Sequence, residues 1–154
     1  MRLPDLITLE RIECDVEAGS KKRALELISA LIARGDVGLG EAEVFESLLA
    51  RERLGSTGLG HGVALPHGRV KTSEKTVGAF VRLRKGVEFD AVDREPVDML
   101  FAMLVPEHST DEHLELLAQL AEMFSDADMR RRLRETADPA AIKRLIDSWQ
   151  PEAY

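Results

Sequence analysis

The feature that most constrains the fold of this chain is the apolar run at residues 97–105. Asp98 is its only charged member, and Pro106 follows it directly. A strand that is apolar on both alternating faces must be covered on both sides, so we predict that it lies at the centre of a sheet between layers of helices. The run is far shorter than the about 20 apolar residues that a membrane-spanning helix requires.

Helices are predicted wherever apolar residues recur at helical spacing. Their expected starts are marked by residues that favour helix N-termini, namely Ser20, Gly40, Ser109, Asp126 and Asp138. Ser109 has Glu112 three residues later, the spacing of a capping box, which places that helix start near residue 110. Gly35 is expected to end the first helix.

The first of these helices opens with three cations, Lys21, Lys22 and Arg23. The positive end of the helix dipole lies at the N-terminus, so cations are unfavourably placed there. Either another need keeps these residues in place, or the fold tolerates their effect.

Further strands are predicted around the central one. The segments concerned are residues 76–83, ended by the Lys85-Gly86 turn, the brief strand Val63 to Leu65, and residues 3–18 as a loop or short strand. Residues 90–95 are expected to be an exposed, hairpin-like connection. Three or more strands among about five helices indicate an α/β fold in which helices cover both faces of one sheet.

Length and composition limit the possible functions. The chain has 154 residues, of which 44% are hydrophobic, and suits one globular domain over residues 1–154. Its net charge of −7 argues against general binding to nucleic acid. An arginine cluster is interpreted as a solvated helix face; it comprises Arg130, Arg131, Arg132 and Arg134.

The N-terminal region and the single cysteine indicate a cytoplasmic protein. Cys14 has no partner for an intramolecular disulfide, and we interpret it as a small apolar filler in preference to a redox sensor. The first residues lack the basic-then-apolar pattern of a secretory signal.

A glycine-rich loop at residues 51–70 is the candidate functional stretch. Its glycines indicate a backbone that takes positive φ angles or approaches something closely; they are Gly55, Gly58, Gly60, Gly62 and Gly68. Pro66 restricts Leu65 to an extended conformation. We therefore expect the imidazole of His67 to sit at the end of a stiffened strand, presented to its surroundings.

Common glycine and metal motifs do not account for this loop. The chain has no P-loop, no G-x-G-x-x-G fingerprint, and no nucleophile elbow, because Leu54 stands where the elbow would need glycine. The spacings of His61 to His67 and of His108 to His113 do not match common zinc sites. We predict no metal and no cofactor.

The residue types in the loop suit phosphoryl transfer to histidine. An imidazole with one unprotonated nitrogen is a nucleophile at neutral pH. Phosphoryl transfer asks the protein for positioning and charge compensation, which loop amides, the Ser56 and Thr57 hydroxyls and a fixed guanidinium could supply. The plain alternative is that His67 is a solvated surface residue.

The run from Arg51 to Gly68 resembles the active-site signature of the fructose/mannitol-type EIIA proteins of the bacterial phosphotransferase system. It is most similar to their nitrogen-regulatory branch. The resemblance implies an α/β sandwich with a mixed parallel and antiparallel sheet. It also implies that His67 accepts a phosphoryl group from an HPr-like carrier, and that His113 is a second active-site histidine.

The resemblance assigns roles to further residues. It suggests Arg51 as the phosphate-binding guanidinium, although Arg53 is a rival and Arg51 could simply complement a helix dipole. The predicted phosphate-binding loop comprises Ser56, Thr57, Gly58, Gly60 and Gly62. His113 would donate a hydrogen bond, or else face water at its helix start. His61 departs from the family pattern and could alter the pKa of His67 if the two lie close.

Three functions follow as hypotheses. The first is a phosphocarrier of the nitrogen phosphotransferase system that takes its phosphoryl group from the HPr-like carrier NPr. It would regulate target proteins such as potassium-transport or sensor-kinase components, as a phosphotransferase component and not as a free-standing metabolic enzyme. The second is a sugar-specific EIIA that passes the group to a separate EIIB, and the third is a non-covalent anion-binding module. None of the three requires nucleic acid or membrane insertion.

Overall fold

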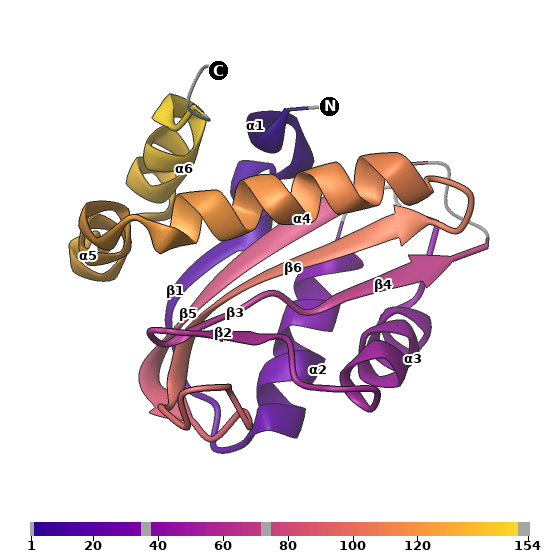
Figure 1. The fold of residues 1–154 in the computed structure, drawn as a ribbon, viewed down its shortest axis with the longest axis horizontal. Helices are drawn as coiled ribbons and strands as arrows, with labels where there is room; N and C mark the ends of the chain where they lie inside the picture. Colours follow the sequence, from indigo (N-terminus) through magenta and orange to yellow (C-terminus); the bar gives the residue numbers. More distant parts are fainter. Residues whose placement is uncertain (1, 35–37, 72–74, 151–154) are drawn as a thin grey trace.

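A computed structural model describes residues 2–34, 38–71 and 75–150, and within them one six-stranded sheet lies between two layers of helices (Figure 1). The strands are β1 (Ile12–Val16), β2 (Gly58–Gly60), β3 (Val63–Ala64), β4 (His67–Val70), β5 (Val77–Val87) and β6 (Val97–Pro106). Their order is β1-β5-β6-β3-β2, and β4 also pairs with β6.

The apolar run at residues 97–105 forms the central strand β6, as predicted. Every residue of β6 is buried except Asp98, which is half-buried. β6 pairs antiparallel with β5 and parallel with both β3 and β4, while β1 pairs parallel with β5. The mixed α/β sheet covered on both faces is therefore confirmed.

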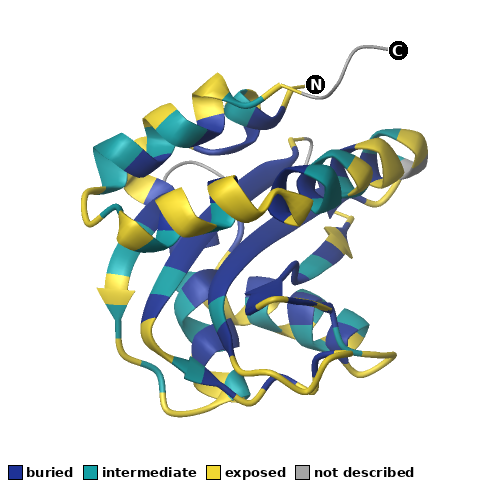
Figure 2. Ribbon diagram, turned by 60° about the vertical axis from the view of Figure 1, so that its left-hand side comes forward, coloured by how far each residue is buried: buried dark blue, intermediate teal, exposed yellow. Residues whose placement is uncertain are grey.

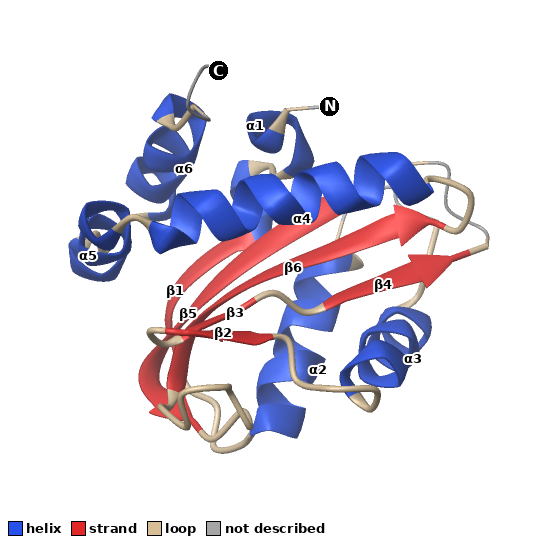
Figure 3. Cartoon of the chain, viewed as in Figure 1, coloured by secondary structure: helices blue, strands red, loops and turns tan. Residues whose placement is uncertain are grey.

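Helices lie on both faces of the sheet (Figure 3), and buried residues are found on the sheet and on the helices of both layers (Figure 2). The buried apolar residues form two separate clusters. One face is covered by α2 (Lys21–Ile32) and α3 (Glu41–Glu52). The other is covered by α1 (Leu3–Leu6), α4 (Thr110–Ser125), α5 (Ala127–Glu135) and α6 (Pro139–Ser148), with a 3₁₀ helix η1 (Leu9–Arg11) before β1. In the part of the chain that the structure describes, no helix has the length and apolar character needed to cross a membrane.

The predicted helix starts are confirmed, with one correction at a cap. The Oγ of Ser20 accepts a hydrogen bond from the backbone N–H of Arg23 at 3.1 Å. The side chain of Ser109 makes no such bond, although α4 begins at Thr110, because the backbone of Ser109 (φ −92°, ψ 59°) departs from the extended capping conformation. Gly35, expected to end the first helix, lies outside the described residues.

Two predicted segments differ in the structure. The strand expected to stop before a turn at Lys85-Gly86 continues to Val87, because Val87 still pairs with Val97 after a register shift. A Cβ at Gly86 would lie 2.8 Å from the Cβ of Pro96, so glycine here permits close approach of the two strands. Residues 3–18, expected as a loop or short strand, contain α1, η1 and β1.

Three arginines of the α5 cluster form ion pairs with acidic side chains. Arg131 pairs with Asp128 and Glu135, Arg132 pairs with Asp128, and Arg134 binds Asp98. The interpretation as a solvated helix face agrees with the exposed Arg131 and Arg132, whereas Arg134 is half-buried and binds the central strand β6 through Asp98. Cys14 is half-buried, and burial raises the pKa of its thiol, which disfavours the reactive thiolate.

Candidate active site

Two histidines from distant parts of the sequence face each other in one pocket. His67 is the first residue of β4, and His113 lies in the first turn of α4; their ring centroids are 5.1 Å apart with an interplanar angle of 68°. The pocket has a volume of about 400 Å³ and also contains Arg51. The structure thus brings together the three residues expected to be catalytic.

Backbone geometry fixes the tautomer of His67. Its Nδ1 lies 2.8 Å from the carbonyl oxygen of Leu65, and the carbonyl of the intervening Pro66 accepts the N–H of Met103 at 2.9 Å. A carbonyl can only accept, so Nδ1 carries the proton and donates it. Nε2 therefore holds the free lone pair, which makes it the nucleophilic nitrogen.

The surroundings keep His67 neutral. Burial is the main factor that lowers the pKa of His67, and the charge of Arg51, with a smaller effect of Arg69, acts in the same direction. The hydrogen bond to Leu65 and the charge of Glu52 oppose this decrease without reversing it. A neutral imidazole with a free Nε2 is the form that can attack phosphorus.

His113 is enclosed, so the alternative in which it faces water is wrong. Only 5% of the residue is exposed. Burial first, and then the charges of His67, Arg69 and Arg51, lower the pKa of His113 to about 4. Its Nδ1 is buried with no hydrogen-bond partner among the described residues. A neutral second imidazole with unused hydrogen-bonding capacity therefore lies beside the nucleophile.

Arg51 reaches the pocket from the last turn of α3. Its Nη1 donates to the carbonyl of Gly55 at 2.8 Å, which holds the guanidinium at the mouth of the pocket. Arg53 is exposed and does not line the pocket. Of the two arginines considered from the sequence, the structure places Arg51 beside His67.

Arg69 is a pocket residue that sequence reasoning missed. It lies two positions after His67 in β4, and side chains two apart on a strand point to the same face, so the spacing itself could have revealed it. Its carbonyl accepts a hydrogen bond from the Oγ of Ser47 at 3.0 Å, which ties β4 to α3. The pocket therefore contains two guanidinium groups.

The glycine loop expected to bind phosphate does not line this pocket. The hydroxyl of Ser56 donates to the carbonyl of Phe89 at 2.8 Å, and that of Thr57 donates to Glu52 at 2.6 Å. Gly58, Gly60 and Gly62 belong to the β2–β3 hairpin, which packs on the segment before β6.

The unusual backbone predicted for this hairpin is nevertheless confirmed. Gly60 and Gly62 have φ angles of 99° and 79°. A Cβ at Gly58 would lie 2.7 Å from the Cβ of Ala91. The glycines thus permit the hairpin to lie close against protein, and the same residue pattern does not distinguish this from an approach to a ligand.

His61 lies away from His67. It occupies the turn of the β2–β3 hairpin, where its backbone N–H donates to Asp93 at 2.9 Å. The flanking Val63 pairs with Met99 and His67 pairs with Met103, a separation of four residues along β6, or about 13 Å. In the described part of the chain, no three side chains of His, Cys, Asp or Glu converge as a metal site would require.

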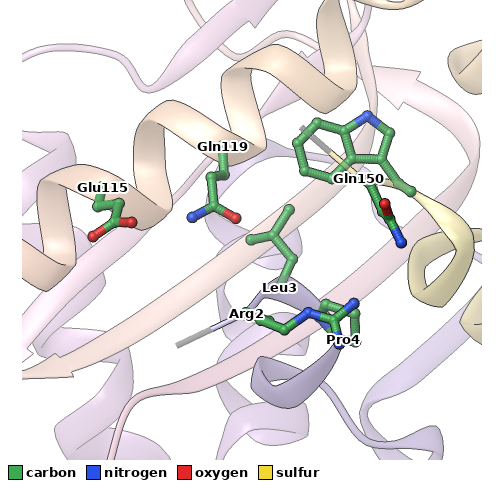
Figure 4. A pocket seen from close by; sticks show the side chains of 7 residues that line it. Arg2, Leu3, Pro4, Glu115, Gln119 and Gln150 are labelled. Atoms are coloured by element: carbon green, nitrogen blue, oxygen red, sulfur yellow. The ribbon is translucent and has the colours of Figure 1, made fainter. Parts of the chain in front are cut away.

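A second cavity, of about 470 Å³, lies between α1, α4 and the end of α6 (Figure 4). Its walls are formed by Arg2, Leu3, Pro4, Glu115, Gln119, Trp149 and Gln150. Glu115 and Gln119 reach it from α4, the helix that also carries His113. This cavity contains no histidine, whereas the other pocket contains two imidazoles and two guanidinium groups, so the histidine pocket is the better candidate for chemistry.

One family model matches nearly the whole chain. The model of the phosphoenolpyruvate-dependent sugar phosphotransferase system, EIIA 2, matches residues 5–149. The chain belongs to this family of EIIA proteins. The crystal structure of mannitol IIA from Escherichia coli shares the fold, with a TM-score of 0.76 at 23% identity over 90% of this chain and 97% of that one.

Closer relatives narrow the class to its nitrogen-regulatory branch. The nitrogen regulatory protein of Pseudomonas aeruginosa is 45% identical over 146 residues, 95% of each chain. That of Escherichia coli is 41% identical over 147 residues, 95% of this chain and 90% of that protein. The structure of nitrogen regulatory protein IIA-Ntr from Neisseria meningitidis has a TM-score of 0.89 and 45% identity, covering 93% of this chain and 97% of that chain.

Proposed function

We propose that this protein is a phosphohistidine carrier that receives a phosphoryl group on Nε2 of His67 from an HPr-like phosphocarrier. One observation carries the proposal. The hydrogen bond from Nδ1 to Leu65 leaves Nε2 unprotonated in a pocket that also contains Arg51 and Arg69.

The transfer needs no co-reactant. Nε2 attacks the phosphorus of the phosphohistidine on the carrier, the P–N bond of the carrier breaks, and its electron pair returns to the imidazole of the carrier. The proton on Nδ1 of His67 stays in place, so the phosphorylated ring is cationic and the carbonyl of Leu65 stabilises that charge. A neutral imidazole is a good leaving group, so the same arrangement lets the group pass on to another protein.

The three neighbours of His67 have complementary roles in this step. Arg51 and Arg69 compensate the charge that spreads over the equatorial oxygens of the phosphoryl group. His113, which is neutral in the unphosphorylated protein because its pKa there is about 4, donates a hydrogen bond to one of these oxygens. The glycine loop contributes indirectly, by holding Arg51 through the carbonyl of Gly55.

The rim of the pocket supports docking of a carrier protein. Leu54 lines the pocket and is 84% exposed, and Leu114, next to His113, is 59% exposed. Exposed apolar side chains beside a reactive group are typical of a protein–protein contact. An incoming carrier would cover both leucines and exclude water from the reacting atoms.

The proposal extends to regulation. We propose NPr as the donor, a cytoplasmic location, residues 1–154 as one EIIA domain, and targets such as potassium-transport or sensor-kinase components. Phosphorylation adds negative charge to the surface around His67, which changes the complementarity to a target. Similarity to nitrogen regulatory proteins at 41–45% identity supports this role over delivery to a sugar-specific EIIB.

Intact-mass spectrometry at neutral to alkaline pH tests the proposal. After incubation with phosphoenolpyruvate, Enzyme I and an HPr-like carrier, we expect a gain of one phosphoryl mass that is lost in mild acid. His67→Ala should abolish this gain, whereas His61→Ala, outside the pocket, should retain it. Labelling that persists in His67→Ala, or none with several competent carriers, would contradict the proposal, and the latter result would favour a non-covalent anion-binding module.

A further inference from the structure

We infer that Glu52 is a positioning residue that controls both the tautomer of His67 and the location of the Arg51 guanidinium. The inference rests on the proposed function, because it identifies what aligns the same site. Glu52 does not line the pocket, and its carboxylate acts through a series of hydrogen bonds.

Glu52 is a buried carboxylate at the end of α3. Its side chain is only 2% exposed. One carboxylate oxygen accepts the backbone N–H of Thr57 at 2.9 Å, and the other accepts the hydroxyl of Thr57 at 2.6 Å. Two bonds from one carboxylate to one residue fix both the position and the orientation of Thr57.

Thr57 passes this constraint to His67. The carbonyl of Thr57 accepts the N–H of Leu65 at 3.0 Å, and the carbonyl of Leu65 accepts Nδ1–H of His67 at 2.8 Å. Leu65, whose carbonyl selects the tautomer of His67, is therefore one hydrogen bond away from Thr57, the residue that Glu52 holds. If Thr57 moves, the carbonyl of Leu65 loses its support.

Glu52 is also connected to Arg51 through hydrogen bonds of Gly55. The backbone of Glu52 accepts the N–H of Gly55 at 3.2 Å, and the carboxylate of Glu52 holds the far end of the same turn through Thr57. The carbonyl of Gly55, fixed within this closed turn, accepts Nη1–H of Arg51 at 2.8 Å. One carboxylate thus sets the geometry of the nucleophile and of its principal cation.

Lys21 supplies the counter-charge that a buried carboxylate needs. Its Nζ lies 3.1 Å from Glu52, donates to the carbonyl of Phe89 at 3.2 Å, and stands 4.6 Å above the ring of Phe89. This contact explains why a cation opens α2 against the helix dipole. Among the described residues, neither Lys22 nor Arg23 has a similar contact.

Two substitutions disrupt different hydrogen bonds between Glu52 and Thr57. Glu52→Gln removes the charge and leaves a single acceptor for the two donors of Thr57, while Thr57→Val removes the hydroxyl and keeps nearly the same shape. Thr57→Ser retains the hydroxyl and serves as the rescue variant. Glu46→Gln, an exposed carboxylate on the same helix, is the matched control.

Nitrogen-15 NMR of the histidine rings in the unphosphorylated protein gives the first readout. We expect a single tautomer of His67, with Nδ1 protonated, in the wild type, in Thr57→Ser and in Glu46→Gln. Glu52→Gln and Thr57→Val should show a mixture of the two tautomers while remaining folded. An unchanged tautomer population in both folded variants would overturn the inference.

Phosphotransfer kinetics give the second readout. Glu52→Gln and Thr57→Val should lower kcat for transfer from the carrier by about 10- to 100-fold, because misplacing a reacting group has this effect. KM for the carrier should change much less than kcat, since neither substitution alters the side chains of Leu54 and Leu114. A rise in KM with unchanged kcat would overturn the inference.

The two readouts separate the inference from the function on which it rests. If the wild type accepts no phosphoryl group but the variants alter the tautomer of His67, the proposed function fails and the positioning role stands. If the wild type and both variants are phosphorylated equally fast, the proposed function stands and the positioning role fails.

Discussion

At His67, a single hydrogen bond gives the two ring nitrogens different tasks. Nδ1 donates its proton to the carbonyl of Leu65, which leaves the free lone pair on Nε2. The neighbouring charges then act on the protonation of both histidines, with Arg51 the stronger influence on His67 and Arg69 the stronger on His113. The role of an individual side chain can therefore be tested by measuring the pKa values of His67 and His113 as well as the phosphotransfer rate.

The first prediction concerns the two pocket arginines. Arg51→Met and Arg69→Met should each raise the pKa of His67 and of His113, because a nearby cation disfavours imidazolium. Arg51→Met should have the larger effect on His67, and Arg69→Met the larger effect on His113. NMR titration of both rings measures these shifts.

Phosphotransfer by the same variants provides a second comparison. The phosphotransfer rate of Arg51→Met and that of Arg69→Met should each fall by about 100-fold, because each substitution removes a charge that stabilises the phosphoryl oxygens. Arg53→Met, an exposed arginine outside the pocket, is the matched control and should transfer at the wild-type rate. Equal rates in all three variants would contradict the assignment of Arg51 and Arg69.

The second prediction concerns pH and stability. The folded state holds His113 with a pKa of about 4, whereas the unfolded chain binds a proton near the ordinary value of 6.5. The unfolded state therefore binds more protons between these values, so the stabilisation is complete above pH 6.5 and is lost as the pH falls toward 4. The shift corresponds to at most about 3 kcal/mol of unfolding free energy.

Urea unfolding at several pH values measures this dependence. His113→Gln cannot titrate, so its unfolding free energy should fall less steeply between pH 6.5 and 4 than that of the wild type. Burial of His67 acts in the same direction and should leave a residual slope in the variant. Identical slopes for the two proteins would show that His113 is not the group responsible.

At the scale of elements, the contact between α3 and β4 sets the width of the pocket. Gly68 lies between His67 and Arg69 in β4, against Ser47 of α3, and an added Cβ would come 3.0 Å from the backbone of Ser47. The Oγ of Ser47 also binds the carbonyl of Arg69. The absence of a side chain at Gly68 is what allows α3, and with it Arg51, to approach His67.

The third prediction follows from this contact. Gly68→Ala should force α3 away from β4, lower the unfolding free energy by about 1–3 kcal/mol, and slow phosphotransfer. Ser47→Ala in addition should restore only part of the stability, because the backbone contact remains. Gly19→Ala, with nothing within 4 Å of the added atom, should be neutral in the same urea titration.

Secondary-structure elements were predicted from the sequence more accurately than the tertiary contacts between them. The central strand, the helices on both faces of the sheet and the helix starts were evident from periodicity and capping residues, because these signals are local. The mixed strand directions were expected only from the family resemblance. The continuation of β5 to Val87 was not evident, because pairing with Val97 overrides the turn signal of Lys85-Gly86. Arg69 was missed because residues 67–70 were not predicted to form a strand, and only a strand places the side chains of His67 and Arg69 on the same face.

The position of the glycine loop was the largest discrepancy at the site. Ser56 and Thr57 are short hydroxyl residues among glycines, a composition that suits anion binding as well as a tight turn. Their hydroxyls instead donate to Phe89 and Glu52, partners that are distant or buried and leave no trace in the local pattern. Only the tertiary contacts distinguish the two uses of the same residues.

At the scale of the whole molecule, the pocket opens where α3, β4 and the start of α4 meet. Exposed Leu54 lines the pocket, and exposed Leu114 is next to the lining residue His113 in the sequence. We expect a partner protein that reaches His67 to contact both leucines. This arrangement makes the rim a test of docking that is separate from the chemistry.

The fourth prediction uses this separation. Leu54→Ser and Leu114→Ser should each raise KM for the HPr-like carrier by about tenfold, with kcat unchanged, because they remove apolar contact area and leave the reacting groups in place. Val92→Ser, at a residue that is 80% exposed and outside the pocket, is the matched control. Unchanged KM values for both leucine variants would place the docking surface elsewhere.

The sheet divides the apolar interior into two compartments that do not share residues. Arg51 is carried by a helix rooted in one compartment, and His113 by a helix rooted in the other, through Leu48 and Leu116 respectively. The helix that carries Arg51 and the helix that carries His113 therefore pack on opposite faces of the sheet. Loosening either compartment would move Arg51 or His113 away from His67 while the sheet stayed intact. Phosphotransfer should therefore be lost on heating before the central strands exchange their amide protons.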